Sequence, residues 1–517
     1  MEKISSQQFF RFWAILGFSA VILIWFLPWR FQTNDDELMM WLVSGAYTGT
    51  PESYAVFIHP LLSWLFSKLY TFFPAIPWYP MTWFGVMYVS YVVFLRLVWG
   101  NSKTKNYHNL SALVTFCLLV HFLLFLQFTI VAGFLAFSGY YVLVFSPEKE
   151  FRKSSFFPWI LLSFSILIRW ESFVLISFGV GLYLVIFKSD FLKKHMLHIG
   201  ILVMLFIVLV SGKTLWGNNS EYAEFRSYNK ARAAVSDHPV TFRLLTEERI
   251  ESNSEWFYFS HWMMDDDSIS TEKLTERKRK LDKELGSLIQ IESSFSRFRN
   301  VLKTEVFKSV FSLFILIGFA FAKGTIPQKT SFFLIWVSFL LVFNHFYILN
   351  GRVIILFVLP FALPVFSAAI DISRSTLMIW VTLLSILLAI HLKNFLTEGK
   401  GRAIMQSEFN AVLRQIPPKS LIVLEGYKEN YLGILYSQSN PVPFLSFGWI
   451  SKSPFQSKAL QRFNLEEIGA TNSFYLVGVD VHEEFFFPLY MNSRFGEFSV
   501  AQKTNFANFI LFEYQRD

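Results

Sequence analysis

Apolar residues along the chain are grouped into long blocks that polar segments separate. Most blocks run for about 15 to 22 residues, the length that a helix needs to cross a hydrocarbon core of roughly 30 Å. The pattern predicts an α-helical polytopic membrane protein with about eleven transmembrane helices. The predicted spans lie within residues 1–31, 79–98, 110–129, 131–145, 157–168, 173–187, 198–210, 306–321, 331–349, 353–370 and 376–392.

Residues 55–73 form a further apolar block, which we expect to lie on the membrane surface. The next block, 79–98, precedes a basic loop, and basic loops prefer the cytoplasmic side. Block 79–98 therefore runs inward, so residues 55–73 cannot also cross and are predicted to form an interfacial helix on the outer side. The same rule makes the N-terminus cytoplasmic. The loops predicted inside carry Lys103, Lys149, Arg152 and Lys153.

Two polar regions interrupt the apolar pattern. Residues 213–304 form a long insertion that we place outside, on the same side as a shorter outer loop at 30–78. From residue 399 onward the composition becomes that of a soluble domain. We therefore predict a transmembrane domain over residues 1–398 and a small C-terminal extracytoplasmic α/β domain over 399–517. Its expected elements are a helix at 407–414 and strands at 421–424, 473–479 and 509–513.

Composition supports the membrane interpretation and narrows the function. Hydrophobic residues make up 53% of the chain and charged residues only 16%, too apolar for an ordinary soluble domain. The net charge of +8 does not indicate nucleic-acid binding, because the lysines and arginines lie between apolar blocks, where they set orientation and touch anionic lipid. The single cysteine, Cys117, excludes an intrachain disulfide and a cysteine-based metal site.

Three adjacent carboxylates follow the first apolar block: Asp35, Asp36 and Glu37. So close to a bilayer they are costly to desolvate unless they meet water, a cation or a substrate. One can act as general base on an acceptor hydroxyl, and a neighbour can orient the acceptor or hold a divalent cation. The alternative is that they cap the helix beginning near Leu38, where negative charge is favoured.

Four more residues are candidates for substrate binding. Arg352 and Arg169 fall at predicted outer helix ends, where a guanidinium can grip a phosphate; alternatively they anchor the helices or pair with a neighbour such as Glu171. Arg232, in the long insertion, can contact donor or acceptor or simply be solvated. His59 can bind substrate or a metal, or start a helix. No dense spacing of histidine or cysteine ligands occurs, so no tightly held metal is predicted.

These motifs resemble the GT-C class of membrane glycosyltransferases, which includes protein O-mannosyltransferases, aminoarabinose transferases and arabinofuranosyltransferases. The likeness is carried by Asp35-Asp36-Glu37 after a first span, by residues 45–51, and by His59-Pro60-Leu61-Leu62 opening the interfacial helix. The mannosyltransferases have an acidic pair and a His-Pro-Pro motif. Here Leu61 replaces the second proline, and the equivalent pair is either Asp35-Asp36 or Asp36-Glu37.

The resemblance implies a transferase of the plasma (inner) membrane that uses a polyprenyl-phosphate-linked sugar on the outer face. The acceptor would be a glycan, a lipid or a protein. Asp35 or Asp36 would deprotonate its hydroxyl, which attacks the anomeric carbon in a single displacement, while Arg352, with Arg169, steadies the departing lipid phosphate.

Two other functions remain open from the sequence. A transporter or flippase of lipid-linked saccharides would carry charges at several depths, whereas here nearly all of them cluster at predicted helix ends. A non-catalytic membrane scaffold would use the C-terminal domain for binding. A Walker loop and a Gly-x-Ser-x-Gly motif are both absent, which argues against an ATP-driven pump and a lipase.

Overall fold

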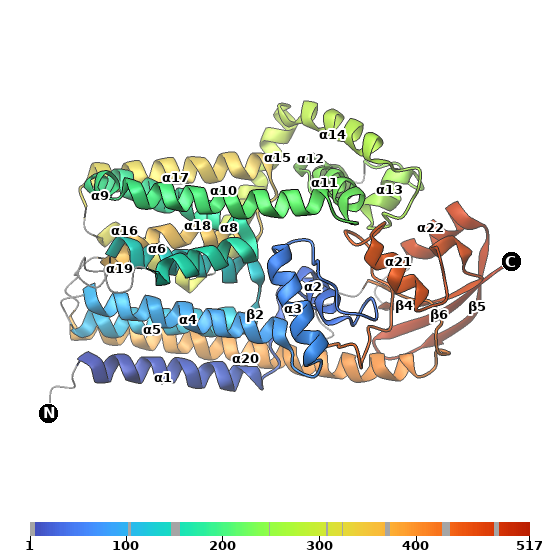
Figure 1. Cartoon of the computed structure of the whole chain (residues 1–517), viewed down its shortest axis with the longest axis horizontal. Helices are drawn as coiled ribbons and strands as arrows, with labels where there is room; N and C mark the ends of the chain where they lie inside the picture. Colours follow the sequence, from blue (N-terminus) through green and yellow to red (C-terminus); the bar gives the residue numbers. More distant parts are fainter. Residues whose placement is uncertain are drawn as a thin grey trace.

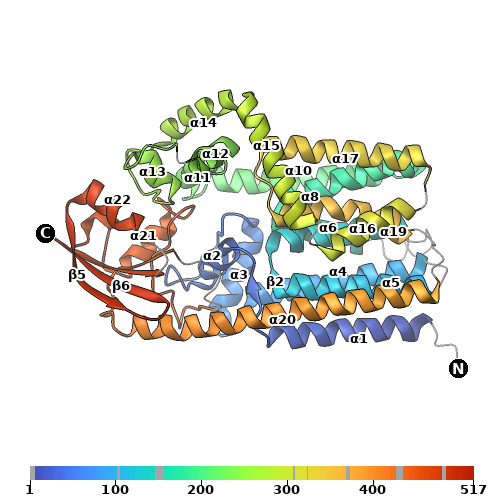
Figure 2. The ribbon, with the colours of Figure 1, turned by 180° about the vertical axis from the view of Figure 1, so that it is seen from behind.

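The computed structural model describes residues 6–101, 105–145, 156–247, 249–306, 309–322, 324–367, 373–426, 435–479 and 485–517. The molecule is elongated, with a bundle of long helices at one end and a mixed helical and sheet region at the other (Figures 1 and 2). This arrangement confirms the predicted class, a mostly helical protein with a small C-terminal sheet.

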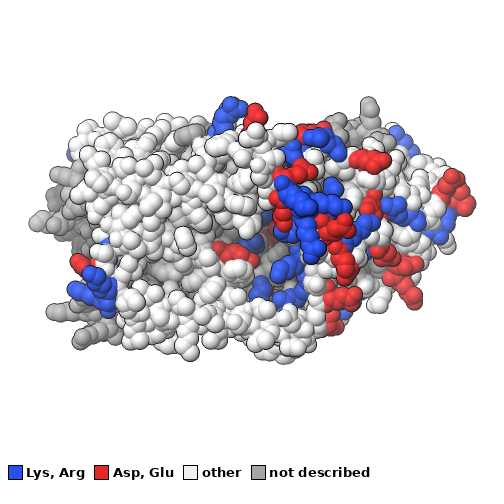
Figure 3. All heavy atoms as spheres, turned by 90° about the horizontal axis from the view of Figure 1, so that it is seen from above, with Lys and Arg blue, Asp and Glu red and all other residues white. Residues whose placement is uncertain are grey.

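The bundle has the properties of a membrane domain. In the part of the chain that the structure describes, seven helices are long and apolar enough to cross a bilayer, or eight if a bent pair counts as one span. Seen from above, most of the visible charged side chains gather over the other end of the molecule (Figure 3). The bundle helices are α1 (Ser6–Trp25), α4 (Trp78–Asn101), α5 (Lys105–Leu124), α6 (Phe128–Phe145), α8 (Phe157–Phe187), α10 (Met196–Asn218), α16 (Val310–Phe321), α17 (Ile326–Phe346), α18 (Gly351–Val358), η2 (Leu359–Phe361), α19 (Ala362–Ser367) and α20 (Arg374–Leu413).

The chain is therefore membrane-embedded, while the count of about eleven spans and the orientation stay predictions. The basic residues on which the orientation depends, Lys103, Lys149, Arg152 and Lys153, lie outside the described residues.

Helix α8 reverses direction at Arg169, whose backbone is extended (φ −157°, ψ 100°). Both halves of α8 lie along α6. In each half, the residues more distant from Arg169 contact residues nearer the C-terminal end of α6. The contacts are Ser165 with Ala132 and Leu162 with Gly139 for the first half, and Phe173 with Tyr140 and Tyr183 with Phe145 for the second. The two halves therefore form a tight hairpin with Arg169 at its tip, as the sequence predicts.

One predicted span is wrong at its end. The block 110–129 was expected to continue unbroken, but α5 stops at Leu124 and α6 begins at Phe128. Between them, β2 (Phe125–Leu126) pairs in parallel with β1 (Arg30–Phe31). The pairing satisfies backbone groups that the helix break exposes, and it brings the start of α6 beside the chain that leads into the acidic motif.

The expected domain boundary at residue 399 does not coincide with a break in structure. Helix α20 runs for 40 residues through it, from Arg374 to Leu413, and so takes in nearly all of the segment 407–414 that the sequence predicts as a separate helix. Gly399 lies against Pro28, where a Cβ would approach to 2.4 Å, and Arg402 donates a hydrogen bond to the Pro28 carbonyl. The close approach to the end of α1 supports α20 where its composition turns polar.

Two short helices lie between the bundle and the rest of the molecule. α2 (Asn34–Ser44) carries the acidic motif, and α3 (Pro60–Phe72) replaces the longer predicted block 55–73. Both views draw α3 across the direction of the bundle helices, and its exposed side includes Leu61, Trp64 and Phe72. These features suit the surface position that the sequence predicts for this helix.

The polar end of the molecule combines the insertion with the C-terminal region. The insertion contains α11 (Ala223–Ser236), α12 (Pro239–Thr246), α13 (Glu255–Ser260), α14 (Thr271–Leu285), α15 (Leu288–Val301) and η1 (Leu302–Val306). The C-terminal sheet has the order β3-β4-β6-β5, in which β3 is parallel to β4 and the other neighbours are antiparallel. Its elements are β3 (Ile422–Glu425), α21 (Pro454–Gln461), η4 (Ile468–Ala470), β4 (Ser473–Val479), α22 (Phe486–Phe495), β5 (Phe498–Asn505) and β6 (Phe509–Arg516).

Three of these strands were predicted and β5 was missed. β5 is exposed along most of its length and carries mainly polar residues, so the sequence lacks the alternation that marks a half-buried strand. It is recruited as an edge strand by its long pairing with β6.

Candidate active site

The acidic motif occupies the first turn of α2, which begins at Asn34 after the N-cap residue Thr33. Thr33 makes no side-chain cap hydrogen bond, so the carboxylates supply the negative charge that a helix N-terminus favours. Successive residues on a helix point in directions about 100° apart, so the three carboxylates face different surroundings. The capping role considered from the sequence therefore does not prevent individual carboxylates from reaching a site.

Asp36 points into the protein and is sealed there, with no exposed surface. Its Oδ1 accepts a hydrogen bond from the Tyr79 hydroxyl at 2.9 Å, and the Phe128 amide donates to both carboxylate oxygens at 3.2 and 3.3 Å. Burial raises the pKa of Asp36 well above its usual range, although these hydrogen bonds oppose the shift. Asp36 thus fastens the start of α2 to α4 and α6.

Asp35 points toward residues from distant parts of the chain. Its Oδ2 lies 3.3 Å from Arg352 Nη1, and its Oδ1 accepts a hydrogen bond from the Trp449 indole at 3.1 Å. About a fifth of the Asp35 side chain and a quarter of the Arg352 side chain remain exposed. Unlike Asp36, the Asp35 carboxylate is partly accessible, and it lies beside the guanidinium group of Arg352.

Arg352 lines a cavity of about 760 Å³ between helices of the bundle. Arg352 and Asn350 lie at the start of α18, and Arg30, Glu398 and Thr33 join them as polar lining residues. Most of the remaining lining is apolar and comes from α5, α16, α18 and α20, including Leu118, Phe122, Phe314, Ile354, Leu384 and Leu388. The cavity therefore suits an amphiphile with an anionic head at Arg352 and an apolar tail.

Arg169 reaches the same region from the tip of the α8 hairpin. Its guanidinium lies over the rings of Phe128 at 4.7 Å and Phe57 at 5.9 Å, and its charge interacts with those of Asp35 and Arg352. The ion pair with Glu171 considered from the sequence is present but long, at 3.9 Å. Arg169 is thus a second cation near Asp35, held by aromatic rings.

His59 has a structural position. Its Nδ1 accepts a hydrogen bond from the Leu61 amide and caps α3, and its Nε2 lies 3.1 Å from the Leu209 carbonyl. Its backbone amide also donates to Leu167. With both ring nitrogens engaged inside the protein, we assign His59 to joining α3, α8 and α10 instead of to the substrate or a metal.

The remaining two candidates are buried. Glu37 is 3% exposed, on the inner side of α2. Arg232 was considered solvated as an alternative, and that interpretation is wrong, because the side chain is 4% exposed and its guanidinium bonds Asn229 and Ser236 within α11. Burial lowers the pKa of Arg232, and interactions with Asp237, Tyr228 and Asp35 oppose that shift.

Sequence reasoning missed the three groups that hold the aspartates: Tyr79, the Phe128 amide and Trp449. Tyr79 lies in a predicted span with no polar partner in sequence, and the amide is available only because the helix breaks before Phe128. Trp449 belongs to the C-terminal region, where no motif indicated a role. Only their spatial approach to α2 reveals them.

Among the described residues, no group of three or more histidine, cysteine or acidic side chains is arranged to hold a metal ion. The divalent cation that the sequence suggests beside the acidic motif stays a prediction.

No protein-family model matches the chain, and no curated protein matches it by sequence. Its structure is similar to two crystal structures of ArnT from Cupriavidus metallidurans. The one bound to undecaprenyl phosphate has a TM-score of 0.41 and 11% identity, over 97% of this chain and 98% of that chain. The apo structure has a TM-score of 0.43 and 10% identity, over 97% of each chain.

Proposed function

We propose that the protein is a membrane glycosyltransferase of the GT-C type, which moves a sugar from a polyprenyl-phosphate donor to a hydroxyl of an extracytoplasmic acceptor. The supporting observation is the contact between Asp35 and Arg352, because Arg352 lines a cavity whose walls are mostly apolar. A carboxylate for the acceptor and a guanidinium for the donor phosphate are brought together from residues 317 positions apart.

The cavity supports the choice of donor. A polyprenyl chain is apolar and fits walls made of α5, α16, α18 and α20, while its phosphate carries the charge that Arg352 can bind with paired N–H donors. Arg169 supplies a second positive charge nearby. A soluble nucleotide-sugar donor would have no use for this apolar lining.

The contacts also favour one of the two aspartates as the base. Asp35 is accessible, whereas Asp36 is sealed and already accepts hydrogen bonds from Tyr79 and Phe128. In the proposed reaction Asp35 takes the proton of the acceptor hydroxyl as its oxygen attacks the anomeric carbon. The bond from that carbon to the phosphate oxygen breaks with its electron pair, and Arg352 stabilises the charge left on the lipid phosphate. A single displacement inverts the anomeric centre.

Transfer by the full-length protein in lipid vesicles tests the proposal. The vesicles contain polyprenyl phosphates that carry radiolabelled sugars, and cell-envelope glycans and lipids serve as acceptors. Because a general base contributes about 10²- to 10⁴-fold, we expect Asp35→Asn to reduce transfer by about 10³-fold. Asp36→Asn keeps one acceptor oxygen that can take the hydrogen bonds of Tyr79 and Phe128 at Oδ1, and it should cost about tenfold or less.

Three results would contradict the proposal. Donor movement across the vesicle without transfer would indicate a carrier. Unchanged transfer by Asp35→Asn would exclude it as the base, and loss of transfer in Asp36→Asn alone would reverse the two roles. Binding of undecaprenyl phosphate to Arg352→Ala, measured by the shift in melting temperature, separates donor binding from chemistry.

A further inference from the structure

One hydrogen bond joins the C-terminal region directly to the proposed base. Trp449 lies between β3 and α21, and its indole Nε1–H donates to Asp35 Oδ1 at 3.1 Å, across 414 positions of the chain. The residue is buried, with 6% of its surface exposed, and its ring meets that of Phe57 edge to face, with centroids 5.0 Å apart. Burial and the ring contact restrict the indole, so its N–H stays directed at Asp35.

The segment that carries Trp449 is fastened on both sides. Before it, the Ser446 amide donates to the Tyr47 hydroxyl at 3.2 Å, and Tyr47 lies in the chain that follows α2. After it, Ser451 Oγ donates to Asp265 Oδ2 at 3.0 Å, which joins the segment to the insertion. The indole is therefore placed by contacts with the chain after α2 and with the insertion.

The two oxygens of Asp35 have partners of different kinds. Oδ1 meets the buried N–H of Trp449, whereas Oδ2 lies 3.3 Å from Arg352 Nη1. That distance is long for a charge-assisted hydrogen bond, which usually spans about 2.7–2.9 Å. Arg352 also lines the cavity, where a donor phosphate would compete for its N–H groups. An anion bound at Arg352 would thus leave Asp35 held through Oδ1 and open at Oδ2.

We propose that Trp449 is a positioning residue, which holds Asp35 through Oδ1 so that Oδ2 receives the proton of the acceptor hydroxyl while Arg352 binds the donor phosphate. This inference rests on the proposed function. As the proton moves to Oδ2, the hydroxyl oxygen bonds the anomeric carbon, and the bond from that carbon to the phosphate oxygen breaks with its electron pair. The rate depends on this geometry, because a displacement of about 1 Å can cost about 10²-fold. The C-terminal region therefore contributes to the active site itself.

Trp449→Phe tests this role, because phenylalanine keeps a ring beside Phe57 and removes the N–H. In the vesicle transfer assay we expect kcat to fall about 10- to 100-fold while KM for the donor changes by less than about twofold, since Arg352 still binds the phosphate. Trp262→Phe is the matched control, because this indole is 53% exposed and lies against Gly448, where a Cβ would approach it to 3.0 Å. The control should keep full transfer.

A replacement of the same size guards against a loss of folding. Benzothienylalanine at position 449, introduced through a reassigned stop codon, keeps the shape of the indole and puts sulfur in place of the N–H. We expect it to lower kcat like Trp449→Phe, with the melting temperature and its shift by undecaprenyl phosphate unchanged. Full transfer by the benzothienylalanine protein would overturn the inference.

A double-mutant cycle separates positioning from a purely structural role. In the Asp35→Asn background, Trp449→Phe should reduce transfer by less than about a further twofold, because no base is left to orient. The same loss in both backgrounds would overturn the inference, as would unchanged or faster transfer by Trp449→Phe alone. Loss of transfer in Asp35→Asn together with full transfer in Trp449→Phe overturns only the positioning role. Full transfer in Asp35→Asn overturns the proposed function and the inference with it.

Discussion

Two adjacent aspartates have different roles because their surroundings differ. Asp35 and Asp36 share a helix turn, yet Asp36 is enclosed by Tyr79 and the start of α6 while Asp35 meets Arg352 and Trp449. Enclosure suits a positioning residue, and accessibility suits a base. The physical difference is the cost of removing a carboxylate from water, which Asp36 bears in full and Asp35 only in part, because about a fifth of its side chain stays exposed.

The buried carboxylate predicts a dependence of stability on pH. Because burial raises the pKa of Asp36 above 3.8, the unfolded state ionises first as the pH rises, and the native state loses stability through that interval. The loss is about 1.4 kcal/mol per pH unit until the raised pKa is passed. Asp36→Asn removes the titrating group. The free energy of unfolding of this variant, relative to that of the unmodified protein, should therefore be higher at pH 8 than at pH 4. Thermal unfolding in detergent measures this difference, and a constant difference between the two pH values would contradict it.

At the scale of elements, the His-Pro pair proves to be a way of starting a helix. His59-Pro60 opens α3, and His238-Pro239 opens α12 in the same manner, since each histidine accepts a hydrogen bond from the amide two residues later. Proline fits the first turn because its missing N–H would have no helical partner there. The repeat within one chain favours the structural interpretation of His59.

Replacing this cap should affect stability more than chemistry. His59→Ala removes the cap of α3 and the contact with Leu209, and we expect a loss of about 1–3 kcal/mol in the free energy of unfolding. His59→Asn should recover part of the lost stability, because asparagine caps well but cannot reach Leu209.

Burial also lowers the pKa of His59, so the stabilising contribution of the neutral ring should weaken as the pH falls below about 6.5. Denaturant titration measures each effect, and full stability with lost donor binding would instead indicate a substrate ligand.

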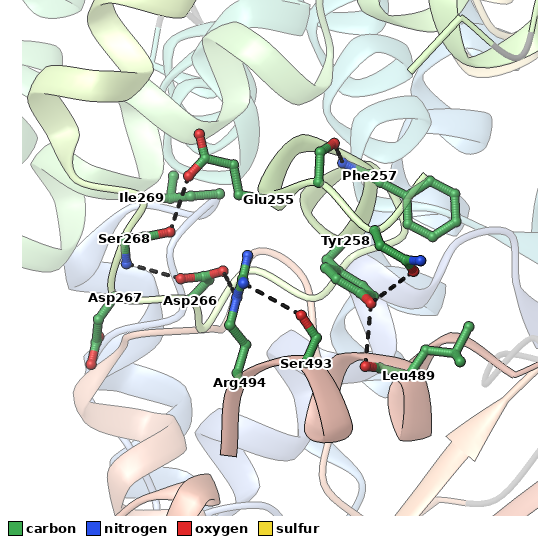
Figure 4. A network of polar contacts seen from close by, with 12 residues as sticks. Glu255, Phe257, Tyr258, Asp266, Asp267, Ser268, Ile269, Leu489, Ser493 and Arg494 are labelled. Carbon is green, nitrogen blue, oxygen red and sulfur yellow. Dashed lines mark hydrogen bonds and ion pairs between the residues drawn. The ribbon is translucent and has the colours of Figure 1, made fainter. Parts of the chain in front are cut away.

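At the scale of the whole molecule, the insertion and the C-terminal region are joined into one cover beside the site. Arg494 Nε lies 2.6 Å from Asp266, and Tyr258 donates a hydrogen bond to the Leu489 carbonyl (Figure 4). Asp265, which precedes Asp266, accepts hydrogen bonds from Ser451 and Gln456 of the C-terminal region, which also holds Trp449. The run of three aspartates at 265–267 therefore fastens two distant segments together.

Breaking this contact should loosen the cover. Arg494→Ala leaves the Asp266 carboxylate, 4% exposed, without its cation, and we expect a cost of about 1–3 kcal/mol. Limited proteolysis of the insertion should be faster than in Arg414→Ala, which removes an exposed arginine from the end of α20. Equal proteolysis of the two variants would show that the contact does not hold the insertion.

The sequence by itself determined the helical membrane class, the polar insertion, three of the four C-terminal strands and the candidate residues Asp35, Asp36, Arg169 and Arg352. These features follow from local patterns, because a bilayer requires long apolar helices and charges gather at their ends. The tertiary structure alone decided that Asp36 is sealed, that Asp35 meets Arg352 and Trp449, that α5 breaks before Phe128 and that α20 continues past residue 399. Each of these depends on side chains or backbone groups that are far apart in sequence, and burial and hydrogen bonding between such groups have no local signature.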